Sequence, residues 1–309
     1  MPTLMRHVWG NVTWHTDPEL RPGGVVIAFS ERTGGRSVAP YATLNMSDRV
    51  DDRPAAVAEN RKLLMQALGL DDEAQKRLCS CIQVHGTAVA RIDAQTAGRA
   101  LPDTDALITA TPNIPLLICV ADCVPVILVA RGPRRALAVV HSGWKGTLAR
   151  ISAVAVEALR EAYGTDPADL TAYIGPYIGP DSFEVSPEVA AQFAEVFPDL
   201  PQTAACEGAG DGGSSGDSAA GSAQPTVRLD LGQAVSLTLR QSGVPADAIA
   251  ILGDDTATNR AHYYSYRAQN GVTGRQAALA CLLPEPEPEP EPKPEPESAA
   301  AVSGEDPHA

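Results

Sequence analysis

Long apolar runs and clusters of basic residues are both missing from this sequence. None of its apolar stretches reaches the roughly 18 residues that a membrane-spanning helix needs. The N-terminus lacks the basic, apolar and small-residue order of a secretion signal, so we expect a cytoplasmic protein with no membrane partner. Because Lys and Arg form no run, nucleic-acid binding through a basic patch is also disfavoured.

Cysteine is scarce as well. The cysteines are too few and too irregularly spaced for a disulfide framework in a chain of 309 residues. We therefore expect reduced thiols, some of them buried and one of them a candidate for function. The six cysteines stand at positions 79, 81, 119, 123, 206 and 281.

The formal net charge of −14 comes in equal parts from the C-terminal tail and from the rest of the chain. Residues 284–309 contain eight Asp or Glu and one Lys, which gives −7 and leaves −7 for the residues before them. The body of the protein is therefore only mildly acidic. Alternating Pro and Glu predict a disordered, polyproline-like tether at 284–309.

Apolar patterning predicts both strands and helices in the body of the chain. Short apolar runs broken by Gly, Pro or Asp favour strands, and these lie at 25–30, 81–86, 105–110, 116–130 and 136–144. Apolar residues at helical spacing favour amphipathic helices, which we expect at 54–69, 147–164, 187–197 and 231–243. Thr147 or Ser142 is available as a cap for the second helix, and Gly164 as its stop.

The same patterns set the expected limits of the domain. Residues 1–22 read as an N-terminal arm or strand, and residues 23–283 as one domain. Within it, residues 207–225 have almost no apolar side chain larger than Ala, so their burial could not offset the loss of chain entropy. We expect this segment to be a disordered surface insertion.

Three polar residues stand where a predicted strand meets a turn: His85 in IQVHG, Cys123 in VADCVPV and His141 in AVVHSGW. If these strands lie side by side, two imidazole nitrogens and one thiolate can share a Zn²⁺ ion and leave a fourth position for water or substrate. Such an ion would lower the pKa of a bound water to roughly 7. The alternative is that all three are ordinary packed or surface residues.

The segment HSGWKGT, residues 141–147, combines glycines, a lysine and a following helix. Free backbone N–H groups and the charge of Lys145 suit an anion such as phosphate, with Ser142 and Gly143 beside it. The alternative is an ordinary strand-to-helix turn with a solvated lysine. With His141 next to this turn, a metal site and an anion site would adjoin.

Six motifs occur in a fixed order: IQVHG, DALIT, ADCVPV, VVHSGWKGT, IGPYIGPDSFEV and YYSYRAQNGVTGRQAA. Together they resemble the YfiH/YlmD family, also described as laccase-domain or multicopper polyphenol oxidase proteins and as peptidoglycan editing factors. The resemblance runs from about Gly23 to Leu283. It implies an α+β (mixed α/β) fold of the YfiH type, a single domain with mixed β-sheets in the interior and helices outside, and the alternation of predicted strands and helices agrees.

The resemblance also implies an activity. It implies cleavage of adenosine, inosine, guanosine and methylthioadenosine by phosphate to the free base and ribose 1-phosphate, together with deamination of adenosine. The implied partners are purine nucleosides and phosphate, with no nucleic acid or membrane, and the implied state is a monomer or weak homodimer. The cofactor would be Zn²⁺, although copper suits the same ligands.

Site residues follow from the motifs one by one. The metal ligands fall on His85, Cys123 and His141, an early loop on Arg32, Gly34 and Gly35, and a helix pair on Asn60 and Arg61. Cys123, Arg61 and Lys145 would be catalytic. Arg61 suits phosphate because a guanidinium fork matches the phosphate oxygens. Alternatively, Arg61 could belong to a solvated helix face. The remaining predicted substrate or phosphate contacts are Arg32, Asn60, Ser142, Gly143, Tyr266 and Arg267. Ser265, Tyr266 and Arg267 would line or support the pocket or, alternatively, form a C-terminal strand.

Two positions depart from the family pattern. Tyr177 replaces a cysteine, and Asp255 with Thr256 replaces a cysteine-threonine pair. None of them is a predicted metal ligand, so metal binding should survive. Asp255 could change the charge of the pocket, or it could simply cap a turn.

Other functions stay open at this point. Cys123 could be the nucleophile of a peptidoglycan editing hydrolase. Polyphenol oxidation with copper is a further alternative, but the six histidines of the chain are fewer than the roughly ten ligands of a multicopper oxidase. A non-enzymatic scaffold that recruits partners through its acidic tail is the last alternative.

Overall fold

The computed structural model describes residues 1–132, 134–204 and 225–284. The predicted insertion at 207–225 and the predicted tail at 284–309 lie outside these ranges, apart from one residue of each. Among the helices within the described ranges, none is both long and apolar enough to span a bilayer.

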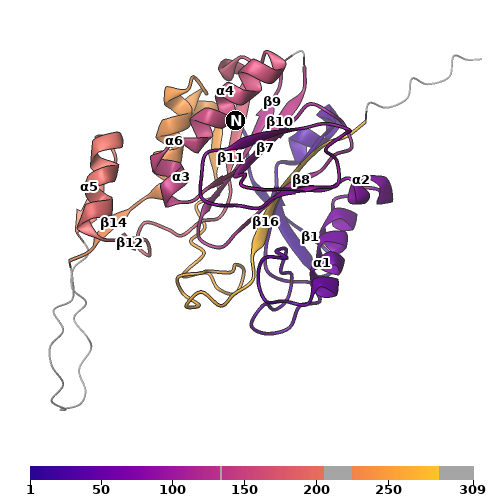
Figure 1. Ribbon diagram of the computed structural model, residues 1–309, viewed down its shortest axis with the longest axis horizontal. Helices are drawn as coiled ribbons and strands as arrows, with labels where there is room; N and C mark the ends of the chain where they lie inside the picture. The colour runs from indigo at the N-terminus through magenta and orange to yellow at the C-terminus, as the bar shows by residue number, and fades with distance from the viewer. Residues whose placement is uncertain (133, 205–224, 285–309) are drawn as a thin grey trace, which may run out of the picture.

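Two mixed sheets form the centre of the molecule, and a small third sheet lies beside them (Figure 1). The first sheet contains, in spatial order, β1 (Met5–Trp9), β2 (Val12–Thr16), β3 (Val25–Ser30), β16 (Gln276–Leu282), β8 (Leu116–Val120), β4 (Cys79–Cys81) and β6 (Ala100–Leu101). The second contains β15 (Ile249–Ile251), β11 (Leu170–Ile174), β9 (Val124–Ala130), β10 (Ala136–Ser142), β7 (Ala106–Thr109) and β5 (Val89–Ile92). The third contains β12 (Glu184–Val185), β14 (Val227–Leu229) and β13 (Gln202–Ala204).

Helices cover the outer faces of the two large sheets. They are α1 (Pro54–Ala67), α2 (Asp72–Lys76), α3 (Trp144–Leu148), α4 (Ile151–Tyr163) and α6 (Leu231–Gln241). A further helix, α5 (Pro187–Val196), instead packs on β14 of the third sheet and on α3. Figure 1 shows α4 and α6 on one side of the molecule and α1 on the other. The expectation of mixed sheets inside and helices outside in one domain is therefore confirmed.

Strand alternation explains this layering. In β9, Ile127 and Val129 face the first sheet, whereas Val126 and Leu128 pack with α4 and α6 on the other side. Successive side chains of a strand point to opposite faces. Both sets are buried because both faces of β9 are covered. Leu117 of β8 likewise packs on the α1 side, away from the inter-sheet core. Strands covered on both faces thus read as unbroken apolar runs.

Three of the four predicted helices appear close to their expected bounds, as α1, α5 and α6. The helix expected at 147–164 is wrong in part, because the chain forms α3 and then α4, with Arg150 between them at a φ of 58°. This left-handed residue breaks the helix where the apolar spacing continues, so the pattern did not reveal it. Neither Thr147 nor Ser142 caps α4, whereas Gly164 ends it in the left-handed conformation as expected.

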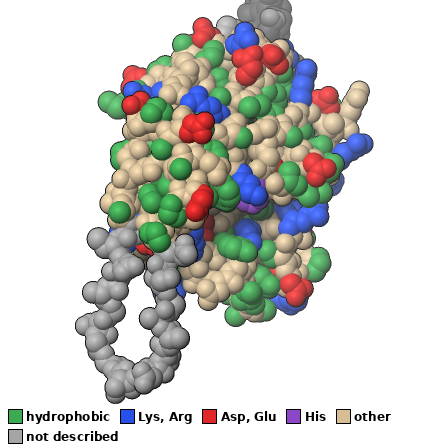
Figure 2. All heavy atoms as spheres, turned by 60° about the vertical axis from the view of Figure 1, so that its left-hand side comes forward, with side chains coloured by type: hydrophobic (Ala, Val, Ile, Leu, Met, Phe, Trp, Pro, Cys, Tyr) green, Lys and Arg blue, Asp and Glu red, His purple; other side chains and the backbone are tan. Residues whose placement is uncertain are grey.

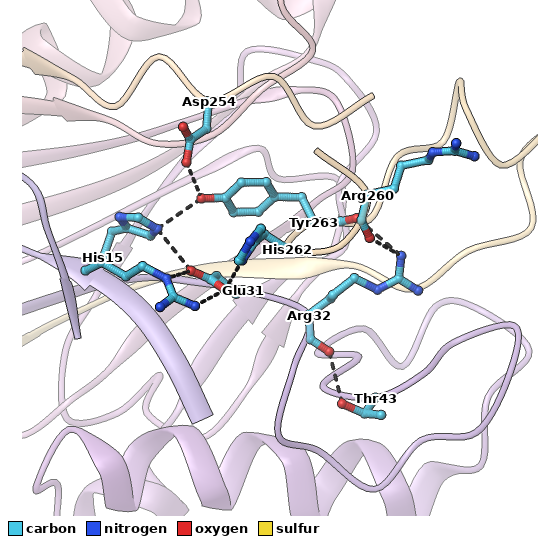
Figure 3. A network of polar contacts seen from close by, with 9 residues as sticks. His15, Glu31, Arg32, Thr43, Asp254, Arg260, His262 and Tyr263 are labelled. Carbon is cyan, nitrogen blue, oxygen red and sulfur yellow. Dashed lines mark hydrogen bonds and ion pairs between the residues drawn. The ribbon is translucent and has the colours of Figure 1, made fainter. Parts of the chain in front are cut away.

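The N-terminal residues are joined to the rest of the first sheet. Strands β1 and β2 form an antiparallel hairpin, and β2 pairs with β3. Figure 3 shows how Glu31, directly after β3, binds His15 of β2 and His262 of a late loop, at 3.3 and 2.7 Å. Arg6 of β1 forms an ion pair with the same carboxylate, which is 1% exposed. One buried acid therefore fastens two distant segments of the chain to each other.

Candidate metal centre

His85, Cys123 and His141 come together in space. Each offers one ligand atom, and these atoms all lie within 4.8 Å of one another. The two imidazole rings are 4.8 Å apart between centroids and meet edge to face. The convergence that the motifs suggested is present in the structure.

Different local structures deliver the three side chains. His141 belongs to β10 and is 3% exposed. Cys123 immediately precedes β9, the neighbour of β10, after Asp122 has turned the chain with a φ of 85°. His85 does not end a strand as predicted, because β4 stops at Cys81 and His85 lies in the following loop with a φ of 60°.

The loop of His85 is held in place by the Asp105 carboxylate. Asp105, which is fully buried, accepts hydrogen bonds from the backbone N–H groups of Val84, His85 and Gly86. It also lies 2.8 Å from His141 Nδ1. This contact favours a proton on Nδ1 and leaves Nε2 free to act as a ligand, which is the usual arrangement around a metal-binding histidine.

The charges of Cys123 and His141 depend on each other. Burial on its own raises the pKa of Cys123, but His141 and His85 outweigh it and lower that pKa to about 6. Burial lowers the pKa of His141, whereas the Cys123 thiolate and Asp105 raise it more. Before any ion binds, the two side chains therefore form a thiolate–imidazolium pair.

The donors fit a single zinc or copper ion. Two imidazoles and one thiolate are ligands that both metals accept. Gly143 makes room for them: a Cβ at this position would lie 2.4 Å from His85 Nδ1 and 3.2 Å from Cys123 Sγ. A residue with any side chain at 143 would therefore push the ligands apart.

The cluster forms one wall of a pocket of about 660 Å³, a volume within the usual range for small-molecule sites. Figure 2 shows a hollow whose edge carries a histidine beside basic side chains. Aromatic residues on the lining are Trp144, Phe183 and Tyr266. Charged residues on the lining, apart from the cluster, are Asp48, Arg49, Arg61, Asp122, Arg267 and Arg275.

Some of the predicted contact residues lie at this pocket. Arg61 lines it from α1, and its Nη2 is 3.2 Å from Asp48 Oδ1. Tyr266 and Arg267 also line it, although they lie in turns and not in a strand. Ser265 is fully buried behind them, where its hydroxyl accepts a hydrogen bond from Ala268 N.

The structure does not bring Arg32 or Asn60 to the pocket lining. The Arg32 guanidinium donates to the carbonyls of Ala42, Arg260 and Tyr263, and Figure 3 shows it directed at Arg260. Asn60 is fully buried, and its side chain binds the backbone of the loop that contains Gly34 and Gly35. Both side chains hold loops together.

Ser142 and Lys145 are also away from the pocket lining. The Ser142 hydroxyl is buried and lies 2.8 Å from Thr147 Oγ1. Lys145 is exposed, with its Nζ 5.5 Å from the centre of the Trp144 ring. The helix that follows, α3, has five residues, so the expected anion site at this turn has little helix dipole behind it.

Several residues at the site were not identified from the sequence. Asp105 and Arg275 lie inside quoted motifs, DALIT and GRQAA, but no periodicity or spacing gave them a role. Asp122 accepts from Thr256 Oγ1 and Arg267 N, and so ties the Cys123 turn to the late loop. Asp255 accepts from the backbone N–H groups of Gly179 and Ala257, so it caps a turn and does not line the pocket.

The fold and the donor set define a class: single-domain mixed α/β proteins with one Cys/His metal-type site in a pocket. The family described as multi-copper polyphenol oxidoreductase laccase matches residues 26–283. The chain therefore belongs to this laccase-domain family, which includes the YfiH and YlmD proteins.

Curated relatives include proteins named purine nucleoside phosphorylase. One from Streptomyces coelicolor is 40% identical over 50% of this chain and 61% of its own length. One from Deinococcus radiodurans is 42% identical over 52% of this chain and 60% of its own length. The chain thus spans about three fifths of these two relatives. The relative named YlmD from Bacillus subtilis is 30% identical over 81% of this chain and 86% of its own length.

Solved structures share the fold. YlmD from Geobacillus stearothermophilus has a TM-score of 0.78 and 27% identity, over 92% of this chain and all of that one. The Bacillus licheniformis protein YfiH has a TM-score of 0.75 and 26% identity, over 87% of this chain and 96% of that one.

Proposed function

We propose that the protein is a metal-dependent purine nucleoside phosphorylase. It would cleave adenosine, inosine, guanosine and methylthioadenosine with phosphate to the base and ribose 1-phosphate, and it would deaminate adenosine to inosine. The observation that carries the proposal is the His85–Cys123–His141 cluster on the wall of a pocket that also presents arginine side chains. The names of the curated relatives support the same activity.

His85, Cys123 and His141 would hold the ion, zinc in the first place and copper as the alternative. When bound, the ion supplies a Lewis acid next to the substrate. The chain's own residues bind and orient the reactants. Trp144, Phe183 and Tyr266 offer aromatic faces for a purine, and Arg61 offers a guanidinium to phosphate.

Positioning matters most for this reaction. Phosphorolysis brings two separate molecules together, so holding both in one pocket removes much of the entropic barrier. The pocket volume of about 660 Å³ leaves room for a nucleoside and an anion together.

The test is a nucleoside panel with and without phosphate on protein of measured metal content. We expect about one zinc per chain and release of free base that depends on phosphate. His85→Ala and His141→Ala should lose both metal and activity, whereas His7→Ala, in the N-terminal hairpin, should keep both. Zinc-loaded protein that releases no base from any of the four nucleosides would refute the phosphorylase.

A second candidate is a hydrolase that uses Cys123 as its nucleophile, as in peptidoglycan editing. The thiolate beside His141 favours it, because a cysteine with a lowered pKa is a nucleophile at neutral pH. This candidate predicts activity on cell-wall precursors in metal-free protein and its loss in Cys123→Ser. Activity that instead disappears with the metal would favour the phosphorylase.

A further inference from the structure

Two arginines, Arg61 and Arg275, approach the same thiol from different elements. Arg61 comes from α1, and Arg275 immediately precedes β16. The positive charges of Arg61 and Arg275 both act on the thiol of Cys119. In the pairing of β16 with β8, Ala277 lies opposite Cys119, so Arg275, two residues earlier, points to the same face. All three side chains line the pocket.

One loop, which contains Asn45 and Met46, holds the guanidinium of Arg61 and the backbone of Arg275. Met46 N donates to the carbonyl of Arg275 at 3.0 Å, and Met46 O accepts from Arg61 Nε at 2.9 Å. Asn45 Oδ1 accepts from Arg275 N at 2.9 Å. Asn60 holds this loop in turn, because its Nδ2 donates to Asn45 O at 2.8 Å. Asn60 is therefore a positioning residue for the two arginines.

The two arginines differ in how far they are already neutralised. Arg61 faces the carboxylate of Asp48, which is 44% exposed. Arg275 Nη1 donates to two neutral carbonyls, those of Thr273 and Gly274. Within the ranges that the structure describes, no ion pair of Arg275 is found. Burial lowers the pKa of Arg275, although an arginine remains charged at any ordinary pH.

The lining carries more arginines than carboxylates, although the negative charges of Asp122 and Cys123 also act on Arg275. Asp122 is the other carboxylate on the lining, and its two oxygens accept from Thr256 Oγ1 and Arg267 N. Arg49 and Arg267 add positive charge to the same lining. A half-buried guanidinium with unused donors, next to a second one, is a receptor for a tetrahedral oxyanion.

We propose that Arg275 and Arg61 form the phosphate subsite of the pocket and that Arg275 is its principal anion-binding residue. This inference rests on the proposed function for the identity of the anion, since only a phosphorylase needs free phosphate there. The charge of Cys123 acts on Arg275, so phosphate at Arg275 would lie near the metal cluster. The same subsite chemistry could accept the phosphate group of a nucleotide.

Equilibrium binding tests the subsite without turnover. Inorganic phosphate, adenosine and adenosine 5′-monophosphate are titrated calorimetrically into zinc-loaded protein at constant ionic strength. We expect Arg275→Gln to weaken phosphate binding at least 10-fold and to leave the Kd of adenosine within a factor of two. The phosphate affinity of Arg275→Lys should lie between those of the unmodified protein and Arg275→Gln, because lysine keeps the positive charge but not the guanidinium fork. Arg160→Gln, on the exposed face of α4, should match the unmodified protein.

The outcomes separate this inference from the proposed function. If phosphate binds through Arg275 but no base is released, the phosphate subsite is supported and the proposed phosphorylase activity is refuted. If only the nucleotide binds and Arg275→Gln weakens it, the subsite stands and serves a nucleotide. An unchanged phosphate Kd in Arg275→Gln overturns the inference, and so does an equal loss of adenosine affinity, which would mean a purely structural role. Thermal unfolding of each variant confirms that it is folded.

Discussion

Asp105 and His141 form a buried pair in which the carboxylate lies 2.8 Å from Nδ1 of the imidazole. The same carboxylate holds the loop of His85 through three backbone N–H groups. One acid thus sets the orientation of two of the three proposed metal ligands. Because its contacts involve both oxygens, replacing one of them by an amide nitrogen removes an acceptor that the loop needs.

Asp105→Asn should therefore weaken zinc binding by about 10- to 100-fold, the usual cost of losing such a partner of a ligand. Competition with a chromogenic chelator measures the change. Asp93→Asn is the matched control, since the hydrogen bonds found for the Asp93 side chain in the described part of the chain go to Gln95 and Thr96 of its own turn. Equal zinc affinity in Asp105→Asn and the unmodified protein would show that this carboxylate does not support the metal site.

Cys123 should be the thiol that reacts first in metal-free protein. Its pKa is lowered to about 6, whereas burial raises the pKa of Cys119 to about 11 and that of Cys281 to about 12. Alkylation requires the thiolate, so its rate should rise through pH 6 and level off above about pH 7. Peptide mapping after iodoacetamide treatment at several pH values follows each site.

This alkylation experiment has two controls. Cys206, which lies outside the described residues, is replaced by Ser in every sample so that it does not compete. Zinc-loaded protein should be protected, because a thiolate that ligates a metal is a poor nucleophile for the reagent. A Cys123 rate that keeps climbing towards pH 9 would contradict the thiolate–imidazolium pair.

The sequence was informative where chemistry depends on residue type and weak where it depends on backbone conformation. Motifs named His85, Cys123 and His141, and apolar periodicity located α1, α5 and α6. The placement of His85 in a loop depends on a left-handed backbone and on Asp105, far away in the sequence, and neither leaves a periodic signal. Arg150 divides a helix for the same reason.

The sequence did not show which arginine faces the pocket. Arg32 and Arg275 both stand beside glycine-containing segments, yet Arg32 binds backbone carbonyls and Arg275 lines the pocket. Only the tertiary pairing of β16 with β8 decides where Arg275 points. A local pattern carries no information about such a pairing.

Glu31 should make the stability of the protein depend on pH in the acid range. Burial alone raises the pKa of Glu31, but hydrogen bonds from His15, Arg6 and His262 lower it to about 2, below the ordinary value of 4.5. A lowered folded-state pKa stabilises the protein above about pH 4.5, and this contribution is lost as the pH falls towards 2. Its size is on the order of 3 kcal/mol.

Urea unfolding at several pH values measures this contribution. Glu31→Gln should be less stable than the unmodified protein at pH 6, and the two free energies of unfolding should converge as the pH falls from 4.5 towards 2. Glu157→Gln, in an exposed pair with Arg160, is the control and should change little at any pH. A difference between Glu31→Gln and the unmodified protein that stays constant from pH 6 to pH 3 would argue against this network.

Gly143→Ala tests whether the metal site depends on close approach of the backbone. The new Cβ would lie 2.4 Å from His85 Nδ1, closer than atoms can pack, so the His85 loop must move while the sheets behind it stay in place. We expect zinc content to fall well below one per chain with a melting temperature within a few degrees of the unmodified protein. Gly23→Ala, where a Cβ meets nothing within 4 Å, should retain its zinc. Full zinc occupancy in Gly143→Ala would mean that His85 is not a ligand, because its ring could not stay where the ion needs it.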